Sequence, residues 1–156
     1  MKFLNEKMKK TEKEIKRSWL GKLILPEFYE INNCVHIMLL NKKDEEPLID
    51  WAEGLENNED RMKFEWNANS AEYEDFIKFN NDNEKMDFGF KLVEIWKTKL
   101  KEQFPNYNFI IVLSFSDNSI IRFNKLRVGT TNYIDEGNIE SFKNDGILVE
   151  KFGPDI

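Results

Sequence analysis

The chain has almost none of the residues that form covalent or metal-bound frameworks. Its 156 residues include one cysteine, Cys34, and one histidine, His36. A single cysteine cannot form an intramolecular disulfide, and these two side chains supply only half of a tetrahedral zinc site. We therefore expect no cofactor and no metal, and a fold that depends on its hydrophobic core. A chain of this length buries roughly 68–70% of its unfolded surface, which is enough for such a core.

Long apolar runs and glycine-rich loops are also missing. The longest uninterrupted apolar stretches, such as Phe109–Leu113, have about five residues, whereas a membrane-spanning helix needs about twenty. The lysines near the N-terminus are not followed by the apolar region of a secretory signal, so we expect a cytoplasmic protein that enters no membrane. No phosphate-binding glycine pattern occurs, which disfavours nucleotide binding.

Nothing in the chain marks a boundary between domains. There is no internal repeat, no glycine and serine linker and no proline-rich stretch. We therefore expect a single globular domain over residues 1–156. The order of predicted elements gives an α+β fold class, with a mostly antiparallel sheet and two main helices packed on one face.

The two main helices are predicted from apolar residues spaced three and four apart. The first covers residues 4–20 and ends at Gly21, with its lysines on the remaining faces. The second covers residues 82–104 and is stopped by Pro105. Gly89 inside the second helix indicates close packing against a strand, because glycine is otherwise unfavourable in a helix.

The strands are predicted from β-branched and aromatic runs and from alternation. The predicted strands are Cys34–Leu40, Leu48–Trp51 after a turn at Asp44–Pro47, Arg61–Trp66, Tyr107–Phe115, Ser119–Leu126 and Gly146–Phe152. Because Phe109–Leu113 is apolar on consecutive residues, we expect it to be a central strand buried on both faces.

Three further expectations complete the predicted fold. In the strand over residues 61–66, Met62, Phe64 and Trp66 are expected to face the core and Glu65 to face water. A short helix is expected to begin at Ser70, where acidic residues follow a capping serine. A loop over residues 129–137 and a short helix over residues 138–142 precede the last strand.

The strongest feature that is present is a concentration of acidic residues. Residues 44–87 hold fifteen carboxylates and four cations, a net charge of −11, and aromatic residues are interleaved with them. Disordered acidic tails are poor in aromatics, so we expect a folded acidic face. Alternatively, these acidic residues serve only to keep the protein soluble.

As a recognition surface, this face would attract a basic protein, with aromatic side chains as anchors. Trp51 and Trp66 are the predicted anchors. The candidate partner-binding residues are Asp44, Glu45, Glu46, Asp50, Trp51, Glu53, Glu56, Glu59, Asp60 and Trp66. The net charge of −6 makes nucleic acid an unlikely partner, because cations supply most of the affinity for phosphates.

Two alternatives from other classes remain open. A metal-dependent hydrolase or nuclease could use acids of the 44–87 band, such as Asp50 and Glu65 with Lys63. Residues 1–22, with a net charge of +5, could form a basic arm for a nucleic acid or an anionic lipid surface. Cys34 and His36 share a strand face but lack the third group of a nucleophilic site, so we expect them to be structural.

In size, charge and the acidic band, the chain resembles the small immunity proteins that bacteria carry beside secreted or contact-delivered toxins. The resemblance covers gross character and no sequence motif. It implies a protein without an active site that neutralises a cognate toxin by masking a cationic nuclease site. The sequence therefore predicts a non-enzymatic binding protein.

Overall fold

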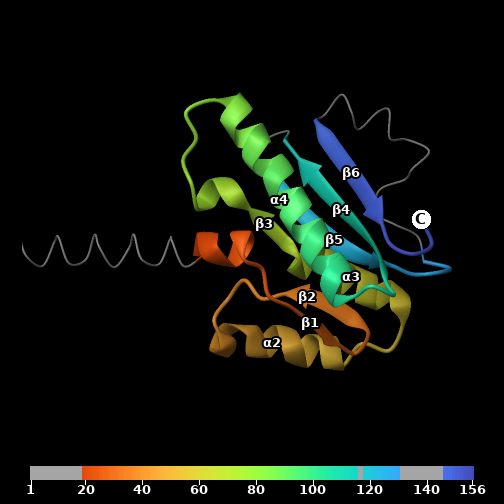
Figure 1. Ribbon diagram of the computed structural model, residues 1–156. Helices are drawn as coiled ribbons and strands as arrows, with labels where there is room; N and C mark the ends of the chain where they lie inside the picture. Colours follow the sequence, from red (N-terminus) through yellow and green to blue (C-terminus); the bar gives the residue numbers. More distant parts are fainter. Residues whose placement is uncertain (1–18, 116–117, 131–145) are drawn as a thin grey trace, which may run out of the picture.

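A computed structural model describes residues 19–115, 118–130 and 146–156 (Figure 1). The fold is α+β, as predicted, with two antiparallel sheets. The four-stranded sheet has the order β3 (Ser70–Glu72), β5 (Ile120–Leu126), β4 (Asn108–Ser114) and β6 (Ile147–Phe152), and the smaller sheet pairs β1 (Phe28–Ile31) with β2 (Cys34–Ile37). The helices are α2 (Lys42–Glu53), α3 (Asn58–Ala68) and α4 (Asp82–Gln103), with further helical residues at 19–24 and a 3₁₀ turn, η1 (Tyr73–Asp75).

The predicted hairpin of β4 and β5 forms the centre of the larger sheet. Strand β4 pairs with β5 on one side and with β6 on the other, both antiparallel. Phe109, Ile111 and Leu113 are buried on the face covered by α4, while Ile110 and Val112 are buried on the opposite face. The prediction that this strand is central and buried on both faces is therefore confirmed.

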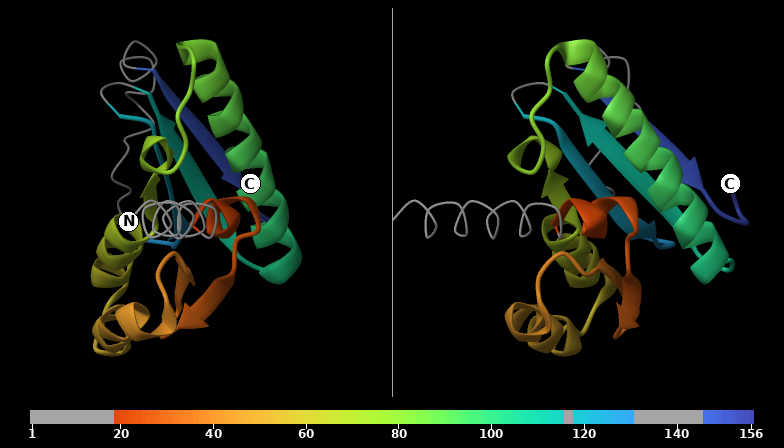
Figure 2. Two further views of the ribbon diagram at one scale, coloured as in Figure 1. Left: turned by 90° about the vertical axis from the view of Figure 1, so that its left-hand side faces the viewer. Right: turned by 60° about the vertical axis from the view of Figure 1, so that its left-hand side comes forward.

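Helix α4 covers one face of the sheet, and α3 lies toward the other face (Figure 2). The predicted second helix is confirmed: the side chain of Asn81 caps its first turn by accepting a hydrogen bond from the Glu84 N–H at 3.0 Å. Trp96, a residue of α4, is fully buried, and its indole N–H donates to the carbonyl of Leu23 at 2.9 Å. This bond holds the helical residues 19–24 against α4.

Strands β1 and β2 form a hairpin that was not predicted, and it packs against the main core. Strands β1 and β2 are joined by Asn32 and Asn33, whose φ angles of 50° and 63° suit a two-residue turn of the type that matches strand twist. The aromatic ring of Phe28 packs edge-on against Trp96 and Phe123. The smaller sheet therefore shares the main hydrophobic core.

Helices α2 and α3 replace three elements that were predicted wrongly: the turn at residues 44–47 and the strands at 48–51 and 61–66. Each helix starts at an asparagine, Asn41 or Asn57, whose side chain accepts from the N–H three residues later. Pro47 suggested a turn, but it lies inside α2. The alternation over residues 61–66 was misread because Glu65 faces inward as well as Met62 and Phe64.

Three other boundaries differ from the predictions. Residues 70–72 form strand β3, paired with β5, and not the start of a short helix, although a 3₁₀ turn follows directly. The predicted strand at residues 34–40 ends at Ile37. Residues 19–24 are helical through Gly21, so Gly21 does not end the first helix, whose residues 4–18 lie outside the described ranges. The short helix at 138–142 and most of the loop at 129–137 also lie outside them.

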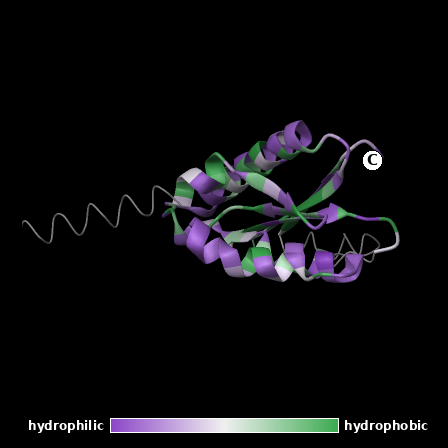
Figure 3. Ribbon diagram, turned by 90° about the horizontal axis from the view of Figure 1, so that it is seen from below, coloured by the Kyte–Doolittle hydropathy of each residue, from purple (hydrophilic) through white to green (hydrophobic). Residues whose placement is uncertain are grey.

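Figure 3 views the molecule from the end that carries α2 and shows hydrophilic residues along the outer helices and hydrophobic residues among the strands between them. Within the described ranges, no helix is long and apolar enough to cross a membrane.

Gly89 provides a test of the packing between α4 and the sheet. A methyl group at Gly89 would lie 2.6 Å from the Tyr73 hydroxyl and 2.9 Å from Leu113, so Gly89→Ala should destabilise the fold by about 1–3 kcal/mol through overpacking. Gly21 is the matched control, because nothing lies within 4 Å of a methyl group there. Gly21→Ala should be neutral or stabilising by up to about 1 kcal/mol, since alanine favours a helix. Urea unfolding of both variants measures the difference, and equal effects would contradict the close approach at Gly89.

Candidate functional site

The structure divides the acidic stretch of the sequence between two ends of the molecule. Helix α2 and the start of α3 lie at one end, whereas the acids at the start of α4, such as Asp82 and Asp87, lie at the other (Figure 1). The net charge of −11 is therefore not displayed on one face. The candidate site is reduced to the acids of α2, of α3 and of the link between them.

Most of the predicted site residues are exposed at this end. The exposed ones are Asp44, Glu46, Asp50, Trp51, Glu53, Glu56 and Glu59. Asp60 and Trp66 are half-buried, and Glu45 is buried. Asp44 and Asp60 accept hydrogen bonds from the capping side chains of Asn41 and Asn57, so part of their charge serves the helix starts.

Five exposed carboxylates remain, and with Trp51 we call them the acidic patch: Glu46, Asp50, Trp51, Glu53, Glu56 and Glu59. None of these carboxylates forms an ion pair with another residue in the described part of the chain. Glu46, Asp50 and Glu53 stand four and three residues apart in α2, which places them along one side of the helix. The exposed cations nearest in sequence are Lys42 and Lys43 in the first turn of α2 and Lys63 in α3.

Trp51 is the aromatic residue of this patch. Its side chain is 49% exposed, and its ring packs edge-on against the buried ring of Phe64, with the centroids 5.0 Å apart. An exposed tryptophan that is supported from below can serve as an anchor, because little side-chain freedom remains to be lost on binding. The structure therefore places Trp51 on the surface.

Trp66, the second predicted anchor, has a different environment. Its ring packs against the apolar cluster of Ile110 and Val112 on the sheet, and the guanidinium of Arg122 lies 5.1 Å from the ring centroid. This tryptophan belongs to the packing between α3 and the sheet. Its proposed role as a surface anchor is not supported by this position.

Glu45 is a correction to the predicted site, because it is only 1% exposed. Its carboxylate accepts backbone N–H bonds from Leu39 at 3.1 Å and Leu40 at 2.9 Å, and the hydroxyl of Tyr29 donates to it at 3.0 Å. The ring Nε2 of His36 lies 2.9 Å from the same carboxylate. Burial raises the pKa of Glu45, but the bonds from Leu40 and His36 outweigh burial and the pKa lies below its ordinary value.

The hydrogen bonds of His36 determine where its protons lie. Its Nδ1 faces the side-chain oxygen of Asn69 at 2.8 Å, and that oxygen also accepts from the Ile37 N–H, while the Asn69 amide nitrogen donates to the Val35 carbonyl. Asn69 is thus fixed as an acceptor toward His36, so Nδ1 carries a proton. The ring Nε2 lies against the Glu45 carboxylate, and this buried contact connects α2 to β2.

Glu65, one of the acids considered for a metal site, is fully buried. One carboxylate oxygen accepts from the Val35 N–H at 2.7 Å, and the other accepts from the Arg127 guanidinium at 2.6 Å and from the Lys125 N–H at 3.2 Å. Burial raises the pKa of Glu65, against the opposing effect of Arg127. Its oxygens are already occupied by protein donors, so the set of Asp50, Glu65 and Lys63 does not form a metal site.

The remaining chemistry near this region is structural. Cys34 is buried, and burial raises the pKa of its thiol to about 12, which keeps it from acting as a nucleophile at neutral pH. Within the described ranges, no group of three or more histidine, cysteine, aspartate or glutamate side chains could hold a metal ion. The side-chain partners Tyr29 of Glu45 and Arg127 of Glu65 were missed because they come from distant parts of the chain.

Comparison with known proteins identifies the family of the chain. The model of one protein family matches residues 1–153 of the 156. The chain belongs to the Uncharacterized protein PM0498 family. No curated protein and no solved structure matches the chain. Family membership thus covers nearly the whole sequence, and the function must be argued from the geometry.

Substitutions of the adjacent residues Glu45 and Glu46 on α2 test the role of the buried contact between Glu45 and His36. Glu45→Ala should destabilise the protein by about 3–5 kcal/mol, because it leaves His36 and two backbone N–H groups without their acceptor. Glu46→Ala is the matched control and should change stability by less than about 0.5 kcal/mol, since Glu46 is exposed. Denaturant unfolding at neutral pH measures both.

The same pair of variants has a defined pH dependence. A carboxyl whose pKa is lowered by folding contributes stability above its unfolded pKa and loses it as the pH falls through the folded value. The cost of Glu45→Ala should therefore shrink as the medium becomes more acidic. A cost that is small at neutral pH, or that grows on acidification, would contradict the role of Glu45 as a buried acceptor whose pKa is lowered by folding.

Substitutions of Trp51 and Trp96 distinguish a tryptophan on the surface from one in the core. Trp96→Ala should cost about 3–5 kcal/mol, because it removes a fully buried ring and leaves a cavity. Trp51→Ala should cost much less, since about half of its side chain already contacts water. Equal destabilisation in denaturant unfolding would place Trp51 in the core and remove it from the acidic patch.

Proposed function

We propose that this protein is a non-enzymatic binding protein that recognises a basic protein partner through the acidic patch. The observation that carries the proposal is the position of Trp51, which is half-exposed and supported by Phe64. It lies on the helix that carries Glu46, Asp50 and Glu53, and these exposed carboxylates form no ion pair within the described residues. A cationic partner would supply the missing counter-charges, and its apolar surface would cover the indole ring.

The scaffold beneath the patch supports this function. Glu45 fixes α2 to the smaller sheet from inside, while Glu46, Asp50 and Glu53 point their charges to the outside of the same helix. A surface that is rigid before binding loses less conformational entropy when the partner docks. Clustered carboxylates also accelerate the encounter with a basic protein at low ionic strength.

A finer form of the proposal follows the resemblance to bacterial immunity proteins. In that form, the partner is a toxin with a cationic nuclease domain, the complex forms in the cytoplasm, and binding masks the toxin's active site. The size of the chain and the exposed carboxylates on the helix of Trp51 support this form. The basic product of a reading frame beside this gene is accordingly the first partner to purify and test.

Charge reversal on the patch tests the proposal. Asp50→Lys/Glu53→Lys should slow association with the purified neighbouring protein by about tenfold at low salt and flatten the salt dependence, because electrostatic steering is lost. The matched control is Asp75→Lys/Asp87→Lys, which changes the net charge equally at exposed positions far from α2. Stopped-flow or surface-binding kinetics over a series of salt concentrations gives both quantities.

The outcomes are distinct. Loss of rate in the patch variant alone supports recognition through α2. Equal loss in the patch and control variants would mean that only net charge matters, and an unchanged rate and salt slope in the patch variant would contradict the proposal.

A further inference from the structure

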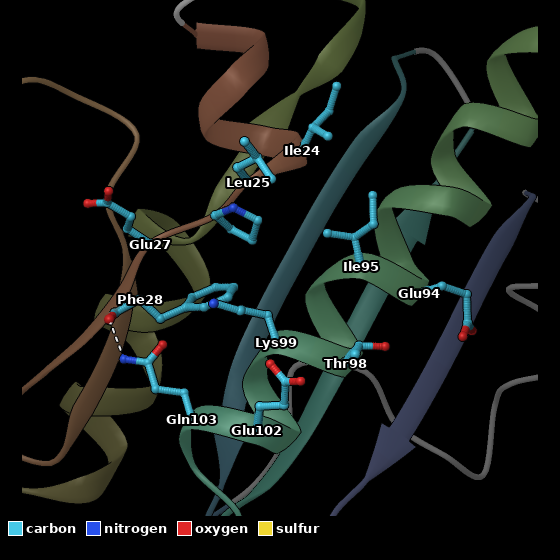
Figure 4. A pocket seen from close by; sticks show the side chains of 11 residues that line it. Ile24, Leu25, Glu27, Phe28, Glu94, Ile95, Thr98, Lys99, Glu102 and Gln103 are labelled. Atoms are coloured by element: carbon cyan, nitrogen blue, oxygen red, sulfur yellow. Dashed lines mark hydrogen bonds between the residues drawn. The ribbon is translucent and has the colours of Figure 1, made fainter.

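A groove separates residues 24–28 from the C-terminal half of α4 (Figure 4). Its volume is about 790 Å³, and Ile24, Leu25 and Ile95 form much of its apolar lining. Leu25 is 78% exposed. Neighbouring apolar side chains at a surface gain free energy when another surface covers them.

The wall that carries Leu25 is fixed by hydrogen bonds on both sides of this residue. The indole N–H of Trp96 donates to the Leu23 carbonyl at 2.9 Å. The side-chain amide of Gln103 donates to the Phe28 carbonyl at 2.7 Å. Leu23 and Phe28 are themselves buried, so the segment between them is held with Leu25 directed outward. Leu25 is therefore covered only if a second molecule docks on this wall.

The charged groups inside the groove are one cation and one anion. Lys99 and Glu102 stand three residues apart on α4 and both line the groove, whereas Glu27 and Glu94 point away from it (Figure 4). Among the described residues, neither Lys99 nor Glu102 has an ion-pair partner. The groove thus presents one unpaired charge of each sign beside an apolar surface.

A surface of this composition is complementary to itself. In a dimer with two-fold symmetry every contact occurs twice, with the two residues exchanged between the copies. If two α4 helices approach in antiparallel directions, Lys99 of each copy meets Glu102 of the other, and the Leu25 side chains of both copies are covered. We propose that this groove is the contact surface of a symmetric dimer of the chain.

The mixed charge of the groove favours a second copy over a strongly charged partner. A basic segment would be repelled by Lys99 and an acidic one by Glu102, because like charges are unfavourable across an interface. A second copy brings an anion for Lys99, a cation for Glu102 and apolar side chains for Leu25, all from one surface. The groove shares no residue with the acidic patch, so the dimer is independent of the function proposed above.

Charge exchange tests the dimer with the full chain. Lys99→Glu alone and Glu102→Lys alone should each weaken dimerisation by about tenfold, because each creates two like-charge contacts per dimer. An equal mixture of the two variants should regain most of the lost affinity, since in a mixed dimer one copy supplies both anions and the other both cations. Sedimentation equilibrium over a range of protein concentrations measures the dissociation constants.

Two further variants control for net charge and for folding. Glu27→Lys is the matched control for Glu102→Lys, because Glu27 is exposed and points away from the groove, and it should leave the dissociation constant unchanged (Figure 4). Leu25→Asn should weaken the dimer by about tenfold or more. At concentrations where the single copy dominates, it should unfold at nearly the same denaturant concentration as the wild type, because Leu25 is exposed there.

Several results would overturn the proposal. A wild-type chain that stays monomeric at millimolar concentration would exclude the dimer. A dimer that neither charge variant weakens, or a mixture that associates no more tightly than either variant alone, would place the contact between copies elsewhere. Equal weakening by Glu27→Lys and Glu102→Lys would mean that net charge alone governs association.

Discussion

The carboxylate of Glu65 is the contact on which the arrangement of the two sheets depends. Glu65 lies in α3, and its carboxylate accepts a hydrogen bond from the Val35 N–H in β2. It also accepts from the Lys125 N–H in β5 and from the side chain of Arg127. Arg127 in turn donates to the carbonyl of Asn33, in the turn between β1 and β2. A buried carboxylate is costly unless every oxygen is satisfied, so these donors must be in place together. This requirement holds the smaller sheet, α3 and the larger sheet in one geometry.

Glu45 is a second buried carboxylate whose hydrogen bonds hold an element in place, in this case α2. Its bonds to His36, Tyr29 and two backbone N–H groups come from residues 29–40, so the helix is held from its inner side. The charges that remain on its outer side are then displayed on a fixed surface. The acidic residues of the sequence thus have three physical roles: buried acceptors that connect elements, partners of the capping asparagines at Asp44 and Asp60, and exposed charges on α2.

What could be predicted from the sequence depended on local signals. The hairpin of β4 and β5 and the helix α4 follow from short-range periodicity and turn residues, and they were predicted close to their observed limits. Helix α2 was misread because Pro47 suggested a turn, and α3 because its alternation suggested a strand, although Asn41 and Asn57 cap these two helices. The inward direction of Glu45 and Glu65 depends on Tyr29 and Arg127, which are distant in sequence. Trp51, whose exposure needs no distant partner, was placed correctly on the surface.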